Sequence, residues 1–302
     1  MRIGISMTEG GGPDALERLT DDVRRAADDG FASAWLSHIF GLDALTSLAI
    51  AGSRVPGIEL GTSVVPTYPR HPAALAQQAR TTALALGGQR LTLGVGLSHK
   101  IVIEDMFGYD FSRPVRHIKE YLSVLSPLLD GQAAAFSGET VKGQISLSVP
   151  NEGRVPLVIA ALGPKMLKVA AEQSDGTILW MTGPKTVREH IVPTIRAAAE
   201  AAGRPDPRVV CILPVGVTDD VEAARARADE VFAVYGHLPS YRAMMDREGV
   251  AGPSGLSVIG DEDTVTAAIE DLKDAGVTDF VAGSFLSGKD KERTRALLKS
   301  LL

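Results

Sequence analysis

Strand and helix signals alternate along the whole chain, and this alternation constrains the fold more than any other feature of the sequence. Short apolar runs rich in β-branched residues are each followed by a longer run with helical periodicity. Across the 302 residues we expect strands at 2–7, 32–37, 58–65, 91–95, 157–160, 177–181, 209–217 and 279–283. Helices are expected at 14–29, 43–53, 73–86, 114–129, 165–172, 186–202, 219–234, 263–275 and 289–302. Repeated βα units of this number predict an α/β protein folded as a (β/α)8 TIM barrel, with an open doubly wound sheet as the alternative.

Two segments are longer than this pattern needs. Residues 132–155 have the alternating, turn-rich character of a β-hairpin, and residues 236–260 have the character of an extra helix followed by a loop. Neither segment is long enough to bury a core of its own. We therefore expect one domain over residues 1–302, with both segments as short insertions in the barrel.

Composition argues against several classes of partner. The net charge of −6 and the lack of a Lys/Arg-rich run disfavour binding to nucleic acid. No apolar run approaches the roughly 20 residues that a membrane-spanning helix needs, and the chain opens on a strand rather than on a cleavable leader. Cys211 is the only cysteine, so no internal disulfide can form and a reducing compartment is expected. The sequence thus predicts a cytoplasmic protein with no membrane partner.

The segment 58–72 places polar side chains at the end of a predicted strand. The strand ends near Pro66, and Pro69 and Pro72 stiffen the loop that follows, with Pro72 suited to the first turn of the next helix. The residues delivered to this loop are Ser63, Thr67, Tyr68, Arg70 and His71. Because α/β barrels hold their catalytic residues at the carboxyl ends of the strands, this loop is a candidate part of a site.

Candidate site residues also follow three other predicted strands. They are Ser37 and His38 after the second strand, Ser98 and His99 after the fourth, and Leu162, Gly163, Pro164 and Lys165 after the fifth. Because the strand ends of a barrel share one mouth, we expect these residues to converge with Ser63. A lone histidine after a strand is more often structural than catalytic, but four successive strands with such ends favour a site.

Gly163 and Pro164 open a predicted helix in a way that suits an anion. Glycine lets the backbone approach a ligand closely, and the first-turn N–H groups carry partial positive charge. Lys165 and Lys168 would add full charges. An ordinary β-to-α turn with surface lysines is the alternative interpretation.

Other familiar motifs are absent or incomplete in the sequence. There is no His-x-His pair, no His-Glu-x-x-His and no cysteine cluster, so we expect no metal site. Gly94-Val-Gly96 imitates the start of a dinucleotide fingerprint, but a third glycine is missing and no helix is expected to begin there. The sequence therefore gives little support to metal or dinucleotide chemistry.

Several short motifs occur in an order that resembles a known family. They are Gly61-Thr-Ser-Val64, Arg70-His-Pro72, Leu93-Gly-Val-Gly96, Ala160-Ala-Leu-Gly-Pro164 and Asp175-Gly176. Over about residues 2–185 the chain resembles the bacterial-luciferase-like superfamily and, within it, the coenzyme F420-dependent oxidoreductases of the glucose-6-phosphate dehydrogenase type. The resemblance implies a TIM barrel that binds a deazaflavin in its mouth and transfers a hydride between the ring and a small organic substrate.

The same resemblance implies roles for individual residues. It implies a non-prolyl cis peptide between Ser63 and Val64, behind the cofactor ring, and it makes His38 the catalytic histidine. His99 stands where the sugar-phosphate enzymes have a catalytic glutamate, so we expect it to be the acid–base partner. Further cofactor contacts are implied at Ser37, Leu97, Ser98, Leu162, Gly163, Pro164 and Lys165. Glucose 6-phosphate is not the expected substrate, because its phosphate-binding residues have no clear counterparts beyond a loose match at Lys185.

The resemblance leaves the cofactor and the activity open. One alternative is a luciferase-like monooxygenase that uses FMN as its cofactor. The other is a barrel that binds the deazaflavin without catalysing a reaction. Lys142, Lys165 and Lys168 are expected near the anionic tail of the deazaflavin. Five aromatic residues are candidates for the lining of a partly apolar substrate pocket, with packing between the loops and the barrel as the alternative role. They are Phe40, Tyr68, Phe107, Tyr109 and Trp180. A homodimer is implied, with its contact through the helices near the second and third strands.

Overall fold

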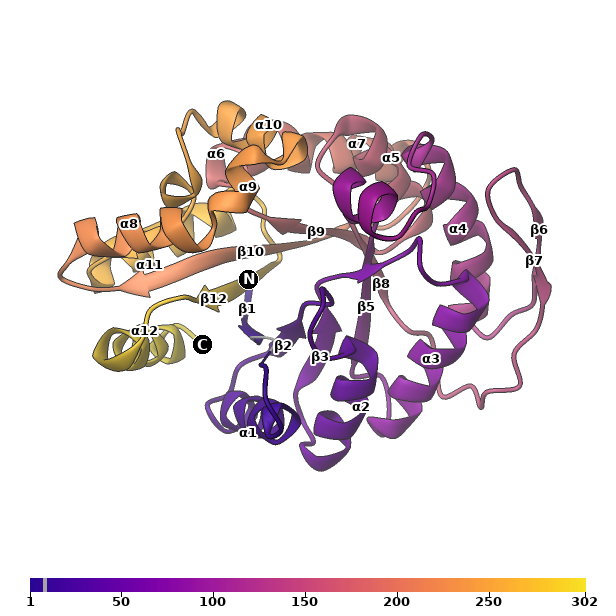
Figure 1. The fold of residues 1–302 in the computed structure, drawn as a ribbon, viewed down its shortest axis with the longest axis horizontal. Coiled ribbons are helices and arrows are strands. Elements are labelled where there is room, and N and C mark those ends of the chain that lie inside the picture. The colour runs from indigo at the N-terminus through magenta and orange to yellow at the C-terminus, as the bar shows by residue number, and fades with distance from the viewer. Residues whose placement is uncertain (8–9) are drawn as a thin grey trace.

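The computed structural model describes residues 1–7 and 10–302, and within them eight parallel strands close into a cylinder (Figure 1). They are β1 (Arg2–Met7), β2 (Ser33–Leu36), β3 (Glu59–Thr62), β5 (Leu91–Gly96), β8 (Leu157–Ala160), β9 (Gly176–Trp180), β10 (Arg208–Val217) and β12 (Asp279–Ser284). Each strand pairs with the next in this order, and the pairing of β12 with β1 closes the ring. The predicted (β/α)8 barrel is confirmed.

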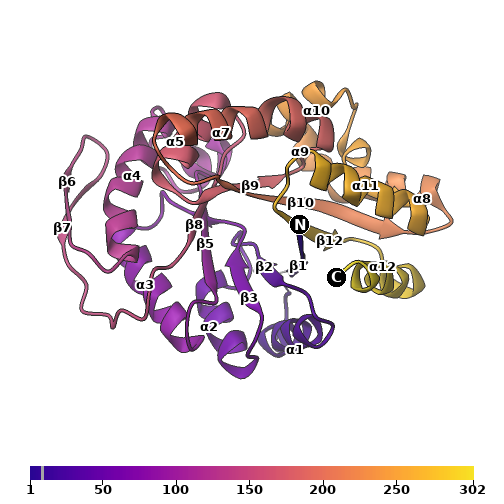
Figure 2. The ribbon, with the colours of Figure 1, turned by 180° about the vertical axis from the view of Figure 1, so that it is seen from behind.

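Helices surround the cylinder and cover the outer faces of its strands (Figure 2). The helices that follow the strands are α1 (Ala15–Asp28), α2 (Ala44–Arg54), α3 (Pro72–Ala85), α4 (Pro114–Leu129), α5 (Pro164–Gln173), α7 (Val192–Ala201), α8 (Val221–Val231), α11 (Glu262–Asp274) and α12 (Gly288–Ser300). α6 (Pro184–Thr186) and a π-helix, η2 (Val187–Ile191), lead directly into α7. The expected helices are present, with ends shifted by a few residues. No described helix is long and apolar enough to cross a membrane.

The insertions follow the prediction in part. The first forms the expected antiparallel hairpin of β6 (Ala134–Ser137) and β7 (Lys142–Ile145). The elements around the second are α9 (Ala233–His237), α10 (Pro239–Glu248), the 3-10 helix η3 (Pro253–Gly255) and β11 (Val258–Gly260). β11 was expected to be loop, and it forms because its backbone pairs with the end of β10.

Two further expectations near the barrel mouth are wrong. The strand expected over 58–65 is divided into β3 and a short β4 (Val65–Pro66). The segment after β5 contains a π-helix, η1 (Ile101–Met106), where we expected only a loop. These elements are six residues long or shorter, which is too short for a periodicity signal.

A tightly packed apolar core fills the inside of the cylinder. Its buried members are Trp35, Val158, Ile178, Val210, Ile212 and Val281, and the partly buried residues packed against them are Val64, Ala160 and Trp180. Gly61 makes room for Trp35, since a Cβ at position 61 would lie 2.3 Å from Cε3 of the indole. The barrel interior is therefore a core rather than a channel.

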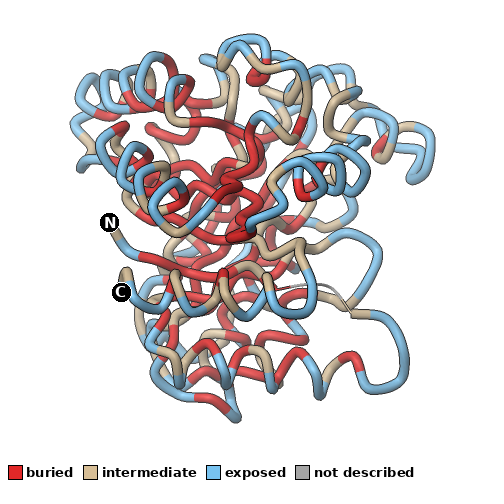
Figure 3. The backbone as a smooth tube through the Cα atoms, turned by 90° about the vertical axis from the view of Figure 1, so that its left-hand side faces the viewer, coloured by how far each residue is buried: buried red, intermediate tan, exposed pale blue. Residues whose placement is uncertain are grey.

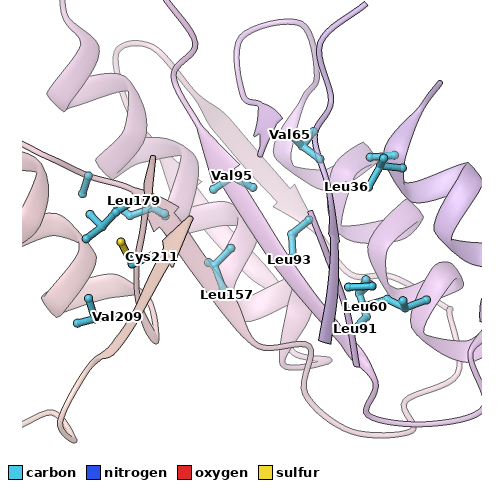
Figure 4. Packing of buried hydrophobic residues seen from close by; sticks show 14 of the residues in the cluster. Leu36, Leu60, Val65, Leu91, Leu93, Val95, Leu157, Leu179, Val209 and Cys211 are labelled. Atoms are coloured by element: carbon cyan, nitrogen blue, oxygen red, sulfur yellow. The ribbon is translucent and has the colours of Figure 1, made fainter. Parts of the chain in front are cut away.

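A second apolar layer lies between the strands and the helices. Figure 4 shows side chains of this layer, among them Leu60, Leu93 and Leu157, and Figure 3 shows the buried backbone running through the middle of the molecule. Cys211 is fully buried in this layer, and its burial raises the pKa of the thiol to about 12. Cys211 is thus a packing residue.

Ion pairs close the end of the cylinder at which the strands begin. Arg208, the first residue of β10, lies 2.9 Å from Glu59 and 2.7 Å from Asp279, which begin β3 and β12. Burial alone would raise the pKa of both carboxyls. The charge of Arg208, with hydrogen bonds from Arg208 to Asp279 and from Thr92 and Arg2 to Glu59, outweighs burial and lowers both pKa values. The opposite end, where the strands finish, is left as the mouth of the barrel.

Candidate active site

Four neighbouring strands bring the predicted site residues to one end of the barrel. β2, β3, β5 and β8 are adjacent in the sheet, and Ser37, Ser63, Leu97 and Leu162 follow closely on their respective ends. The N–H of Ser63 donates to the carbonyl oxygen of Leu36 at 2.8 Å, which ties the break in the third strand to the end of β2. Residues far apart in the sequence are therefore neighbours at the mouth.

The break between β3 and β4 forms part of the floor of the mouth. The peptide bond between Ser63 and Val64 is cis, as the resemblance implied. Val64 packs beside two other strands, since a Cβ on Gly96 would lie 2.7 Å from Val64 Cγ2 and 3.2 Å from Ala160 Cβ. Val64 and Trp180 also pack on the interior core. Val64 therefore lies at the boundary between the barrel core and the mouth.

Gly94 and Gly96, which imitate the start of a dinucleotide fingerprint in the sequence, instead make room for the break between β3 and β4. A Cβ on Gly94 would lie 2.0 Å from the carbonyl oxygen of Thr62, and Thr62 Oγ1 donates to the carbonyl oxygen of Gly94 at 2.8 Å. Gly94 and Gly96 therefore permit the close approach of the third strand and of Val64. Their contacts are with residues about thirty positions earlier, so the local sequence gives no sign of this role.

His38 is held by the start of α2. The N–H of Ala44 donates to His38 Nδ1 at 3.1 Å, so Nδ1 is an acceptor and the neutral imidazole carries its proton on Nε2. Asp43 Oδ2 lies 4.0 Å from the same Nδ1. Arg70 and Gln78 donate to the carboxylate of Asp43 at 2.5 and 3.1 Å. Two loops of the mouth are thereby joined next to the predicted catalytic histidine.

The carboxylate of Asp43 keeps its charge beside His38. Burial would raise the pKa of Asp43, but hydrogen bonds from Thr46 and Arg70 outweigh burial and lower it. Asp43 also caps α2 by accepting the N–H of Thr46 at 2.9 Å. The sequence shows an aspartate before a helix and an arginine in a later loop, but no pattern in it pairs the two.

His99 lies in the turn that leads into η1. Its carbonyl oxygen accepts the N–H groups of Val102 and Ile103 at 2.9 and 3.0 Å, and the preceding Ser98 has a left-handed backbone with φ 61°. The imidazole centroid lies 5.7 Å from the ring of Tyr241 on α10. Burial lowers the pKa of His99 below its ordinary value, so the imidazole is neutral at pH 7.

The turn into α5 presents an open helix N-terminus. Gly163 is the N-cap, and no described side chain caps the helix there. A Cβ on Gly163 would meet no described atom within 4 Å. Lys165 and Lys168 are exposed on the first turns, and Lys168 Nζ lies 3.7 Å from the carboxylate of Glu172. The backbone at Gly163 is thus accessible to a ligand.

His190 fixes the backbone just before this turn. Its Nε2 lies 2.8 Å from the carbonyl oxygen of Leu162, and because a carbonyl only accepts, Nε2 carries the proton and donates. His190 is buried on η2. In the sequence it is one histidine within a helical pattern, so this positioning role could not be recognised.

Several polar residues of the 58–72 loop serve the fold. His71 caps α3, with Nδ1 accepting the N–H of Ala73 at 3.2 Å. Tyr68 stacks on His117 with ring centroids 3.9 Å apart, and Thr67 Oγ1 lies 3.1 Å from His117 Nε2. Burial lowers the pKa of His117 to about 4, so His117 is a neutral packing residue at pH 7.

Lys142 is not where we expected it. It belongs to β7 of the hairpin, which packs on α3 and α4 and is separated from α5 by α4 (Figures 1 and 2). Its carbonyl oxygen lies 2.8 Å from His71 Nε2. The structure therefore does not support a contact of Lys142 with a ligand tail at α5, and the reason is the outward position of the hairpin, which its sequence does not encode.

The aromatic candidates divide into different environments. Three of them are exposed on the loops after β2 and β5, namely Phe40, Phe107 and Tyr109. Tyr68 packs between loops as described. Trp180 lies at the end of β9, with ring centroids 5.6 Å from both Phe232 and Tyr235. The last two residues had not been singled out from the sequence.

The closed barrel, with residues from four neighbouring strand ends around one mouth, defines a (β/α)8-barrel enzyme. Among the described residues, no group of three or more His, Cys, Asp or Glu side chains could hold a metal ion. A sequence model of the luciferase-like monooxygenase family matches residues 1–279. The chain therefore belongs to the luciferase-like monooxygenase family, and the resemblance found in its sequence is confirmed.

Proteins similar to this chain include F420-dependent enzymes. The 5,10-methylenetetrahydromethanopterin reductase of Methanolobus tindarius is 28% identical over an alignment of 315 positions that covers 94% of this chain and 95% of the relative. The F420-dependent glucose-6-phosphate dehydrogenase of Mycolicibacterium gilvum is 32% identical over 201 residues, which cover 64% and 55%. Among solved structures, the coenzyme F420 dependent tetrahydromethanopterin reductase of Methanopyrus kandleri superposes with a TM-score of 0.83 and 25% identity, over 99% of this chain and 97% of that one.

Proposed function

We propose that this protein is a coenzyme F420-dependent oxidoreductase that transfers a hydride between the deazaflavin and a small organic substrate. The observation that carries the proposal is the accessible N-terminus of α5 at Gly163, on the same mouth as Val64 and His38. A helix N-terminus without a described side-chain cap suits the anionic tail of a deazaflavin coenzyme. The similarity to F420-dependent relatives supports the same cofactor.

The mouth fits this cofactor in two parts. The residues that would hold the tail are Leu162, Gly163, Pro164 and Lys165. Gly163 and Lys165 offer backbone N–H groups and Lys165 an ammonium group, whereas Pro164, which has no N–H, would only contact the tail. The residues that would contact the ring are Ser37, Ser63, Val64, Leu97 and Ser98. When bound, the deazaflavin supplies a ring carbon that gives or accepts a hydride. His190 holds Leu162 in place by donating to its carbonyl oxygen.

His38 and His99 are the proposed proton-handling residues. His38 carries its proton on Nε2, because Nδ1 accepts the N–H of Ala44, so its imidazole can donate a proton to the substrate. His99 is neutral at pH 7, because burial lowers its pKa, so its imidazole can accept a proton. Together they serve both directions of proton movement that a reversible hydride transfer requires.

FMN is the alternative cofactor, since the matching family is described as one of monooxygenases. Titration of the purified protein with coenzyme F420, followed by the fluorescence of the deazaflavin, and a parallel titration with FMN separate the two. We expect saturable binding of F420 at micromolar protein and weaker binding of FMN. No binding of F420, or selective binding of FMN, would overturn the proposal.

We further propose that the chain acts as one domain and forms a cytoplasmic homodimer through α2 and α3. Ile39 and Phe40, which precede α2, are 56% and 65% exposed, and exposed apolar residues next to a helix favour an interface. Sedimentation velocity at micromolar concentration should give twice the 31.8 kDa mass of the chain, and Phe40→Ser should shift the protein toward the monomer. A monomeric wild-type protein would refute the dimer.

A further inference from the structure

A continuous set of aromatic rings crosses one side of the mouth. We call it the aromatic strip, and its members in spatial order are His99, Tyr241, Tyr235, Trp180, Phe232 and Phe285. Successive ring centroids are 5.7, 5.2, 5.6, 5.6 and 5.8 Å apart, which is the range of direct ring contact. Each member is partly exposed rather than fully buried. The strip is therefore a packed set of rings that is not fully closed off from solvent.

The aromatic strip is assembled from distant parts of the chain. His99, Trp180 and Phe285 lie at or just after the ends of β5, β9 and β12, so they belong to the mouth. The remaining members come from the segment between the end of α8 and α10, which lies beside β9 and β10 (Figure 1). The chain from the end of α8 to α10, which leads into the second insertion, thus supplies a wall of the mouth next to the predicted acid–base residue His99.

Two sets of contacts hold this wall in place. The carboxylate of Glu248, at the end of α10, accepts the N–H groups of Lys185 and Thr186 at 3.1 and 2.8 Å and the hydroxyl of Thr186 at 2.6 Å. Met245 on α10 is buried with Met181 in a cluster on which several rings of the strip pack. The wall is therefore anchored to the segment after β9 before any ligand arrives.

Charge and hydrogen bonding narrow the chemistry of the ligand. Arg242, the neighbour of Tyr241, donates to Asp246 and to two carbonyl oxygens of the insertion at 2.7–2.9 Å, so its guanidinium is already engaged. The Nε1–H of Trp180 is buried and has no acceptor among the described residues. A buried donor of this kind is stabilised by an oxygen of a ligand.

We propose that the aromatic strip is the substrate-binding wall and that the substrate is a planar, uncharged ring compound with a carbonyl or hydroxyl oxygen. This inference rests on the proposed function and names the class of its substrate. Flat rings stack on partly exposed aromatic rings without a counter-charge, and the membership of His99 in the strip places such a ring in the mouth. A sugar phosphate would require cations that the members of the strip do not supply.

Binding of 2-naphthol to the purified protein, without any deazaflavin, tests this inference by isothermal titration calorimetry. We expect saturable binding of 2-naphthol and none of glucose 6-phosphate at the same concentrations. Phe232→Ala and Tyr241→Ala should each weaken the binding about 2- to 12-fold, the value of one aromatic contact. Val234→Ala is the matched control, because Val234 is 58% exposed on the same short helix as Tyr235, and it should leave the binding unchanged.

The outcomes separate this inference from the proposed function. Failure of F420 to bind would refute the proposed function and leave the naphthol measurement unaffected, because no deazaflavin is present in it. The inference is overturned if 2-naphthol does not bind, if both alanine variants bind it as the wild type does, or if glucose 6-phosphate binds more tightly. Should circular dichroism show an alanine variant unfolded, Phe232→Leu or Tyr241→Leu gives the same comparison, since leucine retains bulk but has no ring face.

Discussion

Replacing Gly163 with valine should weaken the binding of coenzyme F420 without destabilising the protein. Gly163 has φ −82° and ψ 156°, an extended conformation that valine adopts readily. A Cβ there would meet no described atom within 4 Å. The free energy of unfolding should therefore stay constant or rise by about 0.4–1 kcal/mol, as it does when glycine is replaced at a compatible position.

The substitution should instead weaken the binding of coenzyme F420. The methyl groups of valine would occupy the space through which an anionic tail reaches the first-turn N–H groups of α5. Loss of one charge-assisted hydrogen bond is worth about 1.5–3 kcal/mol, which corresponds to a rise in Kd of about 10- to 150-fold. Gly163→Ala should give a smaller rise.

Fluorescence titration of F420 with each variant measures Kd, and thermal melting without cofactor measures stability. An unchanged Kd in Gly163→Val would place the tail of the cofactor away from α5. A Gly163→Val protein that melts well below the wild type would refute the conformational argument, because it would show that the glycine serves the fold.

Other changes test the fold and the pH dependence. Gly94→Ala should destabilise the protein by about 1–3 kcal/mol or more, because its Cβ would lie 2.0 Å from the carbonyl oxygen of Thr62; an unchanged urea midpoint would contradict this. Arg208 lowers the pKa of Asp279, so the stability that Asp279 contributes is present above its unfolded pKa of about 3.9 and is lost as pH falls through the lower folded pKa. Arg208→Met should therefore move acid unfolding to higher pH, and the argument fails if the acid midpoint is the same or lower. Burial lowers the pKa of His99, so the imidazole stays neutral at pH 7 and becomes charged only as pH falls through that lowered pKa. Turnover should fall there, and His99→Asn should lack this dependence. A wild-type rate that falls with acid in the same way as the rate of His99→Asn would show that His99 is not the base.

The barrel could be predicted because the evidence for it is local. Each long strand and helix has its own periodicity, and the number of units then limits the topology. The elements that were missed are short and depend on partners elsewhere in the chain. β11 exists through its pairing with β10, and β4 through its pairing with β5. A single-sequence pattern carries no information on such pairings.

For the mouth of the barrel, the sequence predicted which residues follow the end of each strand, and no more than that. Contacts between loops were not predictable, because they depend on tertiary packing. Arg70 reaches Asp43 from a different loop, and Tyr241 approaches His99 from an insertion. The same limit applies to Lys142, whose position away from α5 does not support the expected contact, since the sequence of a hairpin does not show on which side of the barrel it lies.

A crystal structure of the protein with coenzyme F420 tests the central claim most directly. The account predicts the deazaflavin ring against Val64, the anionic tail at the N-terminus of α5 beside Gly163, and the imidazoles of His38 and His99 next to the ring. A tail bound away from α5, or a ring bound outside the mouth, would contradict it.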